Sequence, residues 1–162
     1  MPSIPFEIND RESIVRGILT PVHIHSKGAK KGKLKPQAFQ SPPGKDEVST
    51  IRHKYIGSDV CKGKIKAISS SNPNQYHGLA VILAEQIRLV GSNIVDSRNP
   101  PNYLGHADIK HGFKSVPNDP PSANERLKQI EHIQRLVDLV IYHPDPDPDS
   151  CNWTGPNLST ES

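Results

Sequence analysis

Cysteine, aromatic residues and long apolar runs are all scarce in this sequence. The 162 residues include 2 cysteines and 5% aromatic residues, and the longest apolar run covers only residues 79–84. Cys61 and Cys151 lie far apart without CxxC spacing, so the sequence indicates neither a disulfide framework nor a zinc ribbon. A bilayer-spanning helix needs about 20 apolar residues, and no basic segment followed by an apolar one comes after Met1. We therefore expect no membrane span, no signal peptide and a location in a reducing cytoplasm.

The signatures of several well-known enzyme classes are absent too. The sequence contains no GxxxxGKS/T, GxGxxG, GxSxG or HExxH motif and no zinc-finger spacing. Phosphate binding by a P-loop, dinucleotide binding in a Rossmann fold and serine hydrolysis at a nucleophile elbow therefore lack their usual motifs.

Proline and glycine are plentiful, and the apolar content is low. With 33% hydrophobic residues, 16 prolines and 11 glycines, the chain fits one modest domain with irregular segments. We expect residues 1–12 to be a flexible N-terminus and residues 13–142 to be a single α+β domain. The sequence HPDPDPDS follows Tyr142, and alternating proline and aspartate forms neither a β-ladder nor a helix. Residues 143–162 are therefore expected to be a disordered acidic tail.

Short stretches rich in Ile, Val and Tyr predict the strands. A glycine and a proline interrupt residues 13–24, which predicts a strand, a kink and a second short strand. Residues 48–56 and 103–110 predict two further strands, and residues 65–68 predict a short additional piece.

Two segments predict helices. Residues 76–97 are best interpreted as a helix that ends at Gly91 and a strand that follows it. Part of residues 78–83 fits a strand as well, because a short apolar run does not distinguish the two. Ser122 or Asn124 caps the second helix, whose apolar residues fall on one face: Leu127, Ile130, Ile133, Leu136, Val137 and Val140. We therefore expect an α+β domain in which one or two helices pack on a mostly antiparallel sheet.

Charge is distributed unevenly along the chain. Residues 1–75 hold 13 Lys and Arg against 6 Asp and Glu, whereas residues 76–162 hold 7 against 11. The two halves can attract each other within one fold, or the basic half can bind an anionic partner. Positive charge is densest in residues 27–35, an expected exposed loop or hairpin tip. Its candidate anion-binding residues are Lys30, Lys31, Lys33 and Lys35.

Four residues with metal-ligating side chains occur as two pairs with i,i+2 spacing. His23 and His25 would point to the same face of an extended segment, and His106 and Asp108 would do so on the next candidate strand. His111 follows the second pair, and together the two strands offer a divalent metal three or four ligands. The chance alternative is that a sequence with 8 histidines produces such pairs without any metal.

Arg16, Arg52 and His106 are the candidate catalytic residues. Two arginines on neighbouring strands can hold a phosphate or a carboxylate through bidentate hydrogen bonds. A histidine titrates near neutral pH and can act as a general acid or base. The alternative for Arg52 is a structural pair with an Asp or Glu.

Three short motifs resemble a group of small uncharacterised bacterial proteins. The chain carries KLKPQAF at 33–39, DEVSTIR at 46–52 and NPPNYLGHADI at 99–109, which are similar to the AF, VSxxR and NPxHAxI-like motifs of that group. The resemblance extends over residues 14–112 and implies no assigned activity. It draws attention to Phe39, Ser49, Arg52, Asn99, His106 and Ala107.

These observations support two functional hypotheses. The first is a small accessory or binding protein that contacts an anionic partner, a nucleic acid or an acidic protein, through its basic half. The second is a small enzyme that acts on a nucleotide or phosphoester with an Arg/His site, with or without a metal. The sequence leaves the oligomeric state open.

Overall fold

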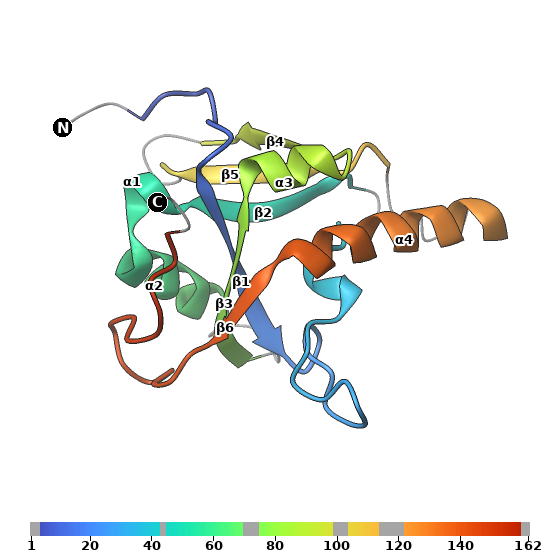
Figure 1. The fold of residues 1–162 in the computed structure, drawn as a ribbon. Helices are drawn as coiled ribbons and strands as arrows, with labels where there is room; N and C mark the ends of the chain where they lie inside the picture. Colours follow the sequence, from blue (N-terminus) through green and yellow to red (C-terminus); the bar gives the residue numbers. More distant parts are fainter. Residues whose placement is uncertain (1–3, 43–44, 70–74, 99–103, 114–121, 160–162) are drawn as a thin grey trace.

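The computed structural model (Figure 1) describes residues 4–42, 45–69, 75–98, 104–113 and 122–159. One sheet forms its centre and carries helices on both faces. The described helices include none that is both long and apolar enough to cross a bilayer.

Six strands form the sheet, in the order β4-β5-β2-β1-β3-β6. Every neighbouring pair is antiparallel, so the predicted α+β class with a mostly antiparallel sheet is confirmed. The strands are β1 (Ser13–Thr20), β2 (Glu47–Arg52), β3 (Gln75–Leu83), β4 (Asn93–Asp96), β5 (His106–Lys110) and β6 (Ile141–Pro144).

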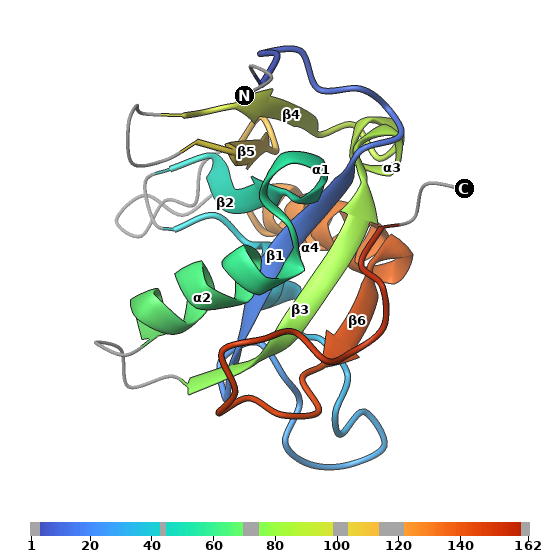
Figure 2. The same cartoon turned by 90° about the vertical axis from the view of Figure 1, so that its left-hand side faces the viewer.

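The two faces of the sheet are covered by different helices (Figure 2). One face carries α3 (Ala84–Leu89), α4 (Ala123–Leu139) and the 3-10 helix η1 (Pro36–Phe39). The other face carries α2 (Ser58–Ser69), which follows the short α1 (His53–Ile56). Alternation along β1 serves both layers, because Ile14 and Ile18 pack toward the first face and Val15 toward the second.

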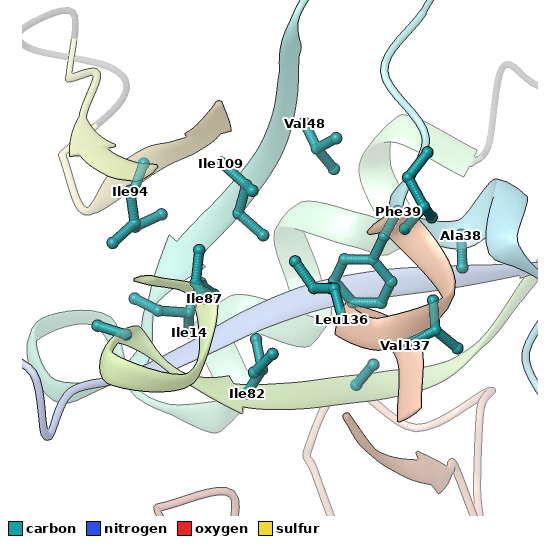
Figure 3. Packing of buried hydrophobic residues seen from close by; sticks show 14 of the residues in the cluster. Ile14, Ala38, Phe39, Val48, Ile82, Ile87, Ile94, Ile109, Leu136 and Val137 are labelled. Carbon is teal, nitrogen blue, oxygen red and sulfur yellow. The ribbon is translucent and has the colours of Figure 1, made fainter. Parts of the chain in front are cut away.

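The larger core lies between the sheet, α3, α4 and η1. Figure 3 shows side chains from these elements converging on Phe39 and Leu136, which are both fully buried. Ser122, one of the two predicted caps, accepts a hydrogen bond from the Glu125 backbone and caps α4. Only the C-terminal half of the apolar stripe of α4 is buried, since Leu127 and Ile130 remain exposed.

The helix α2 replaces the short piece predicted at residues 65–68. Its packing depends on Gly17 of β1, where a Cβ atom would come within 2.4 Å of the Ile65 side chain. The missing side chain therefore lets α2 approach the sheet closely. In residues 76–97 the strand alternative holds for β3, and the helix is limited to α3.

Both expected flexible ends contribute to the folded body. In the N-terminal segment, Ile8 is part of the larger core and Glu12 is 1% exposed. At the other end, residues 143–144 belong to β6 and Leu158 is fully buried against α2's face of the sheet. Residues 4–12 and 143–159 thus differ from the flexible N-terminus and disordered tail expected from composition; residues 160–162 lie outside the described part of the chain.

An ion pair holds the C-terminal segment to α2. Lys62 Nζ lies 2.9 Å from Asp145 Oδ2, and neither side chain is exposed. Lys62 also donates to the carbonyls of Asp147 and Asn152, and Tyr76 donates to the Asp145 carboxylate. After β6 the segment has no further helix or strand among the described residues, and these specific bonds order it instead.

Candidate functional site

The sheet separates along the line between β1 and β2. These strands pair at only two positions, Ile14 with Arg52 and Val15 with Ile51, although β1 continues to Thr20 in register with β3. Figure 2 shows β1 and β2 diverging beyond that point. The divergence leaves backbone groups of β2 without a neighbouring strand on this side.

Arg16 bridges the separated strands. Its Nε donates to the Ala38 carbonyl at 3.0 Å, and its Nη1 donates to the Ser49 carbonyl of β2 at 3.0 Å. The guanidinium thus satisfies a β2 carbonyl and ties it to η1. The Arg16 side chain is half-buried, and the loss of contact with water lowers its pKa to about 10.

A cavity of about 400 Å³ lies at this separation, under α2. Its polar lining comes from β1, β2, α2 and β5: Arg16, Ser49, Thr50, Lys64 and His106. Its apolar lining comes from β2, α2 and the turn before β5: Ile51, Ile65, Ala67, Ile68 and Leu104. The volume lies within the range of small-molecule sites, and a mostly apolar wall with a few convergent polar groups is typical of them.

The cavity contains two of the three candidate catalytic residues. Arg16 and His106 both line it, as the second hypothesis requires. Ser97 Oγ lies 2.5 Å from Nδ1 of His106, and the Asp108 carboxylate is 3.8 Å from the same nitrogen. The hydrogen bond to Ser97 holds the orientation of the imidazole.

Arg52 does not line the cavity and uses all of its donors within the chain. It is fully buried. Its Nε and Nη2 donate to the two carboxylate oxygens of Glu12, and Nη1 donates to Asp96. The two remaining N–H groups donate to the carbonyls of Pro5 and Glu7. Five bonds saturate a guanidinium, so the geometry matches the alternative of a structural pair and leaves Arg52 no donor for a ligand held by Arg16.

The four candidate metal ligands are not gathered in one place. His23 lies in a turn beyond β1, where its Nδ1 accepts from the Leu19 backbone, whereas His106 is paired with Ile51 across β2. Burial, together with the charge of Arg16, lowers the pKa of His23 to about 4. Among the described residues, no three His, Cys, Asp or Glu side chains form a group that could hold a metal ion.

Residues 22–35 form a hairpin, which we call the lysine hairpin. An isolated bridge joins Ile24 to Leu34, and backbone bonds link His25 with Lys33 and His23 with Lys35. The hairpin extends from the end of β1, away from the helices (Figure 1). Three of the four predicted anion-binding residues are exposed, and the fourth, Lys35, is half-buried at the hairpin's base.

A cluster of two histidines and one serine was not predicted from the sequence. Ser92 Oγ lies 2.7 Å from His111 Nδ1 and 2.7 Å from His132 Nε2. His111 Nε2 lies 2.7 Å from the Phe39 carbonyl, to which it donates. The donated proton fixes the tautomer and leaves Nδ1 to accept from Ser92. No local spacing connects these residues, which come from a turn, the end of β5 and α4.

Residues of the three resemblance motifs meet near Arg16. Ala38 and Ser49 accept its hydrogen bonds, and His106 lines the same cavity. Phe39 and Ala107 are fully buried core residues, and Asn99 lies outside the described residues. No family model, curated protein or solved structure matches this chain.

Proposed function

We propose that this chain is a small binding protein that contacts the phosphate backbone of a nucleic acid through the lysine hairpin. The observation that carries the proposal is the concentration of unopposed positive charge on one projecting element. Lys27, Lys30, Lys31 and Lys33 are all exposed, and residues 13–45 contain no Asp or Glu. No ion pair joins these lysines to any carboxylate of the described residues.

The hairpin favours phosphates over base edges. Lysine is a flexible point charge that binds phosphate without reading sequence. The hairpin also contains no Phe, Tyr or Trp on which a base can stack, and the ring of His23 is buried. We therefore expect affinity that is independent of sequence and strongly dependent on salt. A cytoplasmic location would place the chain with nucleic acid and keep both of its free cysteines reduced.

Fluorescence anisotropy with a labelled single-stranded oligonucleotide tests this function. The variant K30A/K31A/K33A should weaken binding at low salt by at least roughly 10-fold, because three phosphate contacts are lost. The matched control is K45A/K54A/K128A, which removes the same charge from three exposed positions outside the hairpin. Equal loss in both variants would show that net charge, and not the hairpin, causes binding. If polyglutamate displaces the labelled oligonucleotide as well as the unlabelled oligonucleotide does, the result would instead indicate an acidic protein partner.

The alternative function, a small enzyme that acts on a nucleotide or phosphoester, is favoured by one observation. Arg16 and His106 line the same cavity, where one can hold an anion and the other can transfer a proton. Arg52 does not take part in that geometry. The cavity therefore supports a smaller site than the two-arginine clamp.

A further inference from the structure

The half-buried Arg16 differs from the two fully buried cations, Arg52 and Lys62, in that no carboxylate of the described residues pairs with it. Arg52 is paired with Glu12 and Asp96, and Lys62 is paired with Asp145. The described contacts of Arg16 are two neutral carbonyls. Partial withdrawal of a cation from water without a counterion has a free-energy cost. An anion bound beside the guanidinium would compensate that cost.

The geometry leaves donors for such an anion. A guanidinium has five N–H groups, and carbonyls of the described residues accept from Nε and from Nη1 only. Nη2 has no acceptor among those residues. Because Arg16 lines the cavity, a ligand oxyanion there can accept from this edge of the guanidinium.

The neighbouring charges favour an anion as well. Lys64 of α2 lines the same cavity, as does His106. Asp108 lies on the same face of β5, opposite Ser49, but it does not line the cavity and its carboxylate faces His106. The cavity wall therefore carries two permanent positive charges and no negative one among the described residues.

The rest of the wall is apolar and open at one end. Ile65 packs against β1 at the inner end, while Ile68 and Leu104 are 62% and 43% exposed. Large apolar side chains exposed around a hollow are typical of ligand sites. A ligand with an apolar body can cover them while its charged end reaches Arg16.

We propose that this cavity binds a small molecule with an oxyanion head, a carboxylate or a phosphate, and an apolar body. The head accepts hydrogen bonds from Arg16 and Lys64, and the body packs against Ile65, Ile68 and Leu104. This site is separate from the lysine hairpin and does not depend on its function.

Calorimetric titration of the full chain with matched probes tests the proposal. Octyl phosphate and octanoate carry both features, 1-octanol lacks the charge and inorganic phosphate lacks the body. At least one of the two octyl anions should bind at least roughly 10-fold more tightly than octanol and than phosphate, which corresponds to about 1.4 kcal/mol. The better of the two identifies the head group. Equal binding of octanol and both octyl anions would overturn the proposal, as would the absence of binding by both.

Variants at Ile68 place the site without disturbing the fold, because this side chain is exposed. I68E and I68Q shorten the apolar wall equally, but only I68E adds a negative charge to the wall of the cavity. I68E should weaken the octyl anion at least roughly 5-fold more than I68Q does, because like charges repel across a partly desolvated cavity. Equal effects of the two variants would overturn the proposed location. K30A/K31A/K33A should bind the octyl anion as the wild type does, so failure of the hairpin function leaves this result readable.

Discussion

Replacement of Arg52 by methionine should destabilise the fold more than any surface substitution. The variant removes five hydrogen bonds and leaves the Glu12 carboxylate, 1% exposed, without a cation. Asp96 keeps its partner, because Arg98 Nε and Nη2 both donate to it at 2.8 Å. The damage is therefore concentrated on Glu12, which retains one backbone hydrogen bond from Asn9.

The size of the effect follows from the burial of this pair. Removal of one partner of a buried ion pair costs about 3–5 kcal/mol, because the other charge stays buried and uncompensated. With a urea m-value of roughly 2 kcal/mol/M, the unfolding midpoint should fall by about 2 M. Urea denaturation followed by circular dichroism measures that shift.

A second substitution separates the buried charge from the lost packing. In E12Q/R52M the orphaned carboxylate becomes a neutral amide, so the double variant should be more stable than R52M alone. A midpoint shift of R52M that corresponds to less than about 1 kcal/mol would refute the reasoning, because exposed ion pairs have values of that size.

The pH dependence of stability gives an independent check on the same cluster. Burial alone raises the pKa of Asp96, but hydrogen bonds from Arg98 and Arg52 outweigh it and hold the pKa below its usual value. Asp96 therefore stabilises the fold fully above the unfolded pKa of about 4, and this contribution is lost as the pH falls through the lower folded value. The acid limb of the stability curve should be shallower in R52M.

Two further predictions concern the contacts of α2. D145N leaves the Lys62 ammonium buried without a carboxylate, so chymotryptic cleavage after Trp153 should accelerate markedly. The control D149N changes an exposed position and should be cleaved like the wild type. Equal cleavage rates of the two variants would contradict the role of the ion pair. G17A brings a Cβ atom into contact with the Ile65 side chain and should lower the free energy of unfolding, measured by urea denaturation, by about 1–3 kcal/mol. The second substitution I65A should largely reverse this loss. Additive destabilisation by the two substitutions would refute the close approach of α2 to β1.

Local pattern predicted the elements whose signal is local. A cap at Ser122 or Asn124 and the apolar stripe predicted α4, and the Lys/Gly content of residues 27–35 predicted an exposed loop or hairpin tip there. The N-terminal half of the stripe is exposed because α4 continues beyond the part that packs on η1 and the sheet (Figure 1). A stripe shows which face is apolar, but it does not show how far the partner surface extends.

Elements that depend on distant partners were missed. The sequence of α2 contains several lysines and one glycine, and its pattern gives no sign that Lys62 is buried against Asp145. The C-terminal segment is rich in proline and aspartate, a composition that predicts disorder. Long-range bonds nevertheless order residues 145–159. Composition reports the local tendency of a segment and not the side chains that meet it in the fold.

The candidate site shows the same limit. Arg16 and Arg52 both lie in segments that the sequence predicts as strands, and nothing local distinguishes them. The fold shows that Glu12 and Asp96 pair with Arg52, whereas no described carboxylate pairs with Arg16. The proximity of Arg16 and His106 depends on β5 lying beside β2, which no spacing reveals. The helix α2, which the sequence pattern did not predict, contributes Lys64, Ile65 and Ile68 to the cavity wall.

The slope of affinity against salt is the most direct test of the lysine hairpin. For single-stranded nucleic acid, log K falls by about 0.7 per phosphate contact for each unit of log salt concentration, so four lysines predict a slope of roughly −3. Removal of Lys30, Lys31 and Lys33 leaves Lys27 and should reduce the slope to roughly −1, while K45A/K54A/K128A should keep the wild-type slope. An unchanged slope in the hairpin variant would contradict the proposed function.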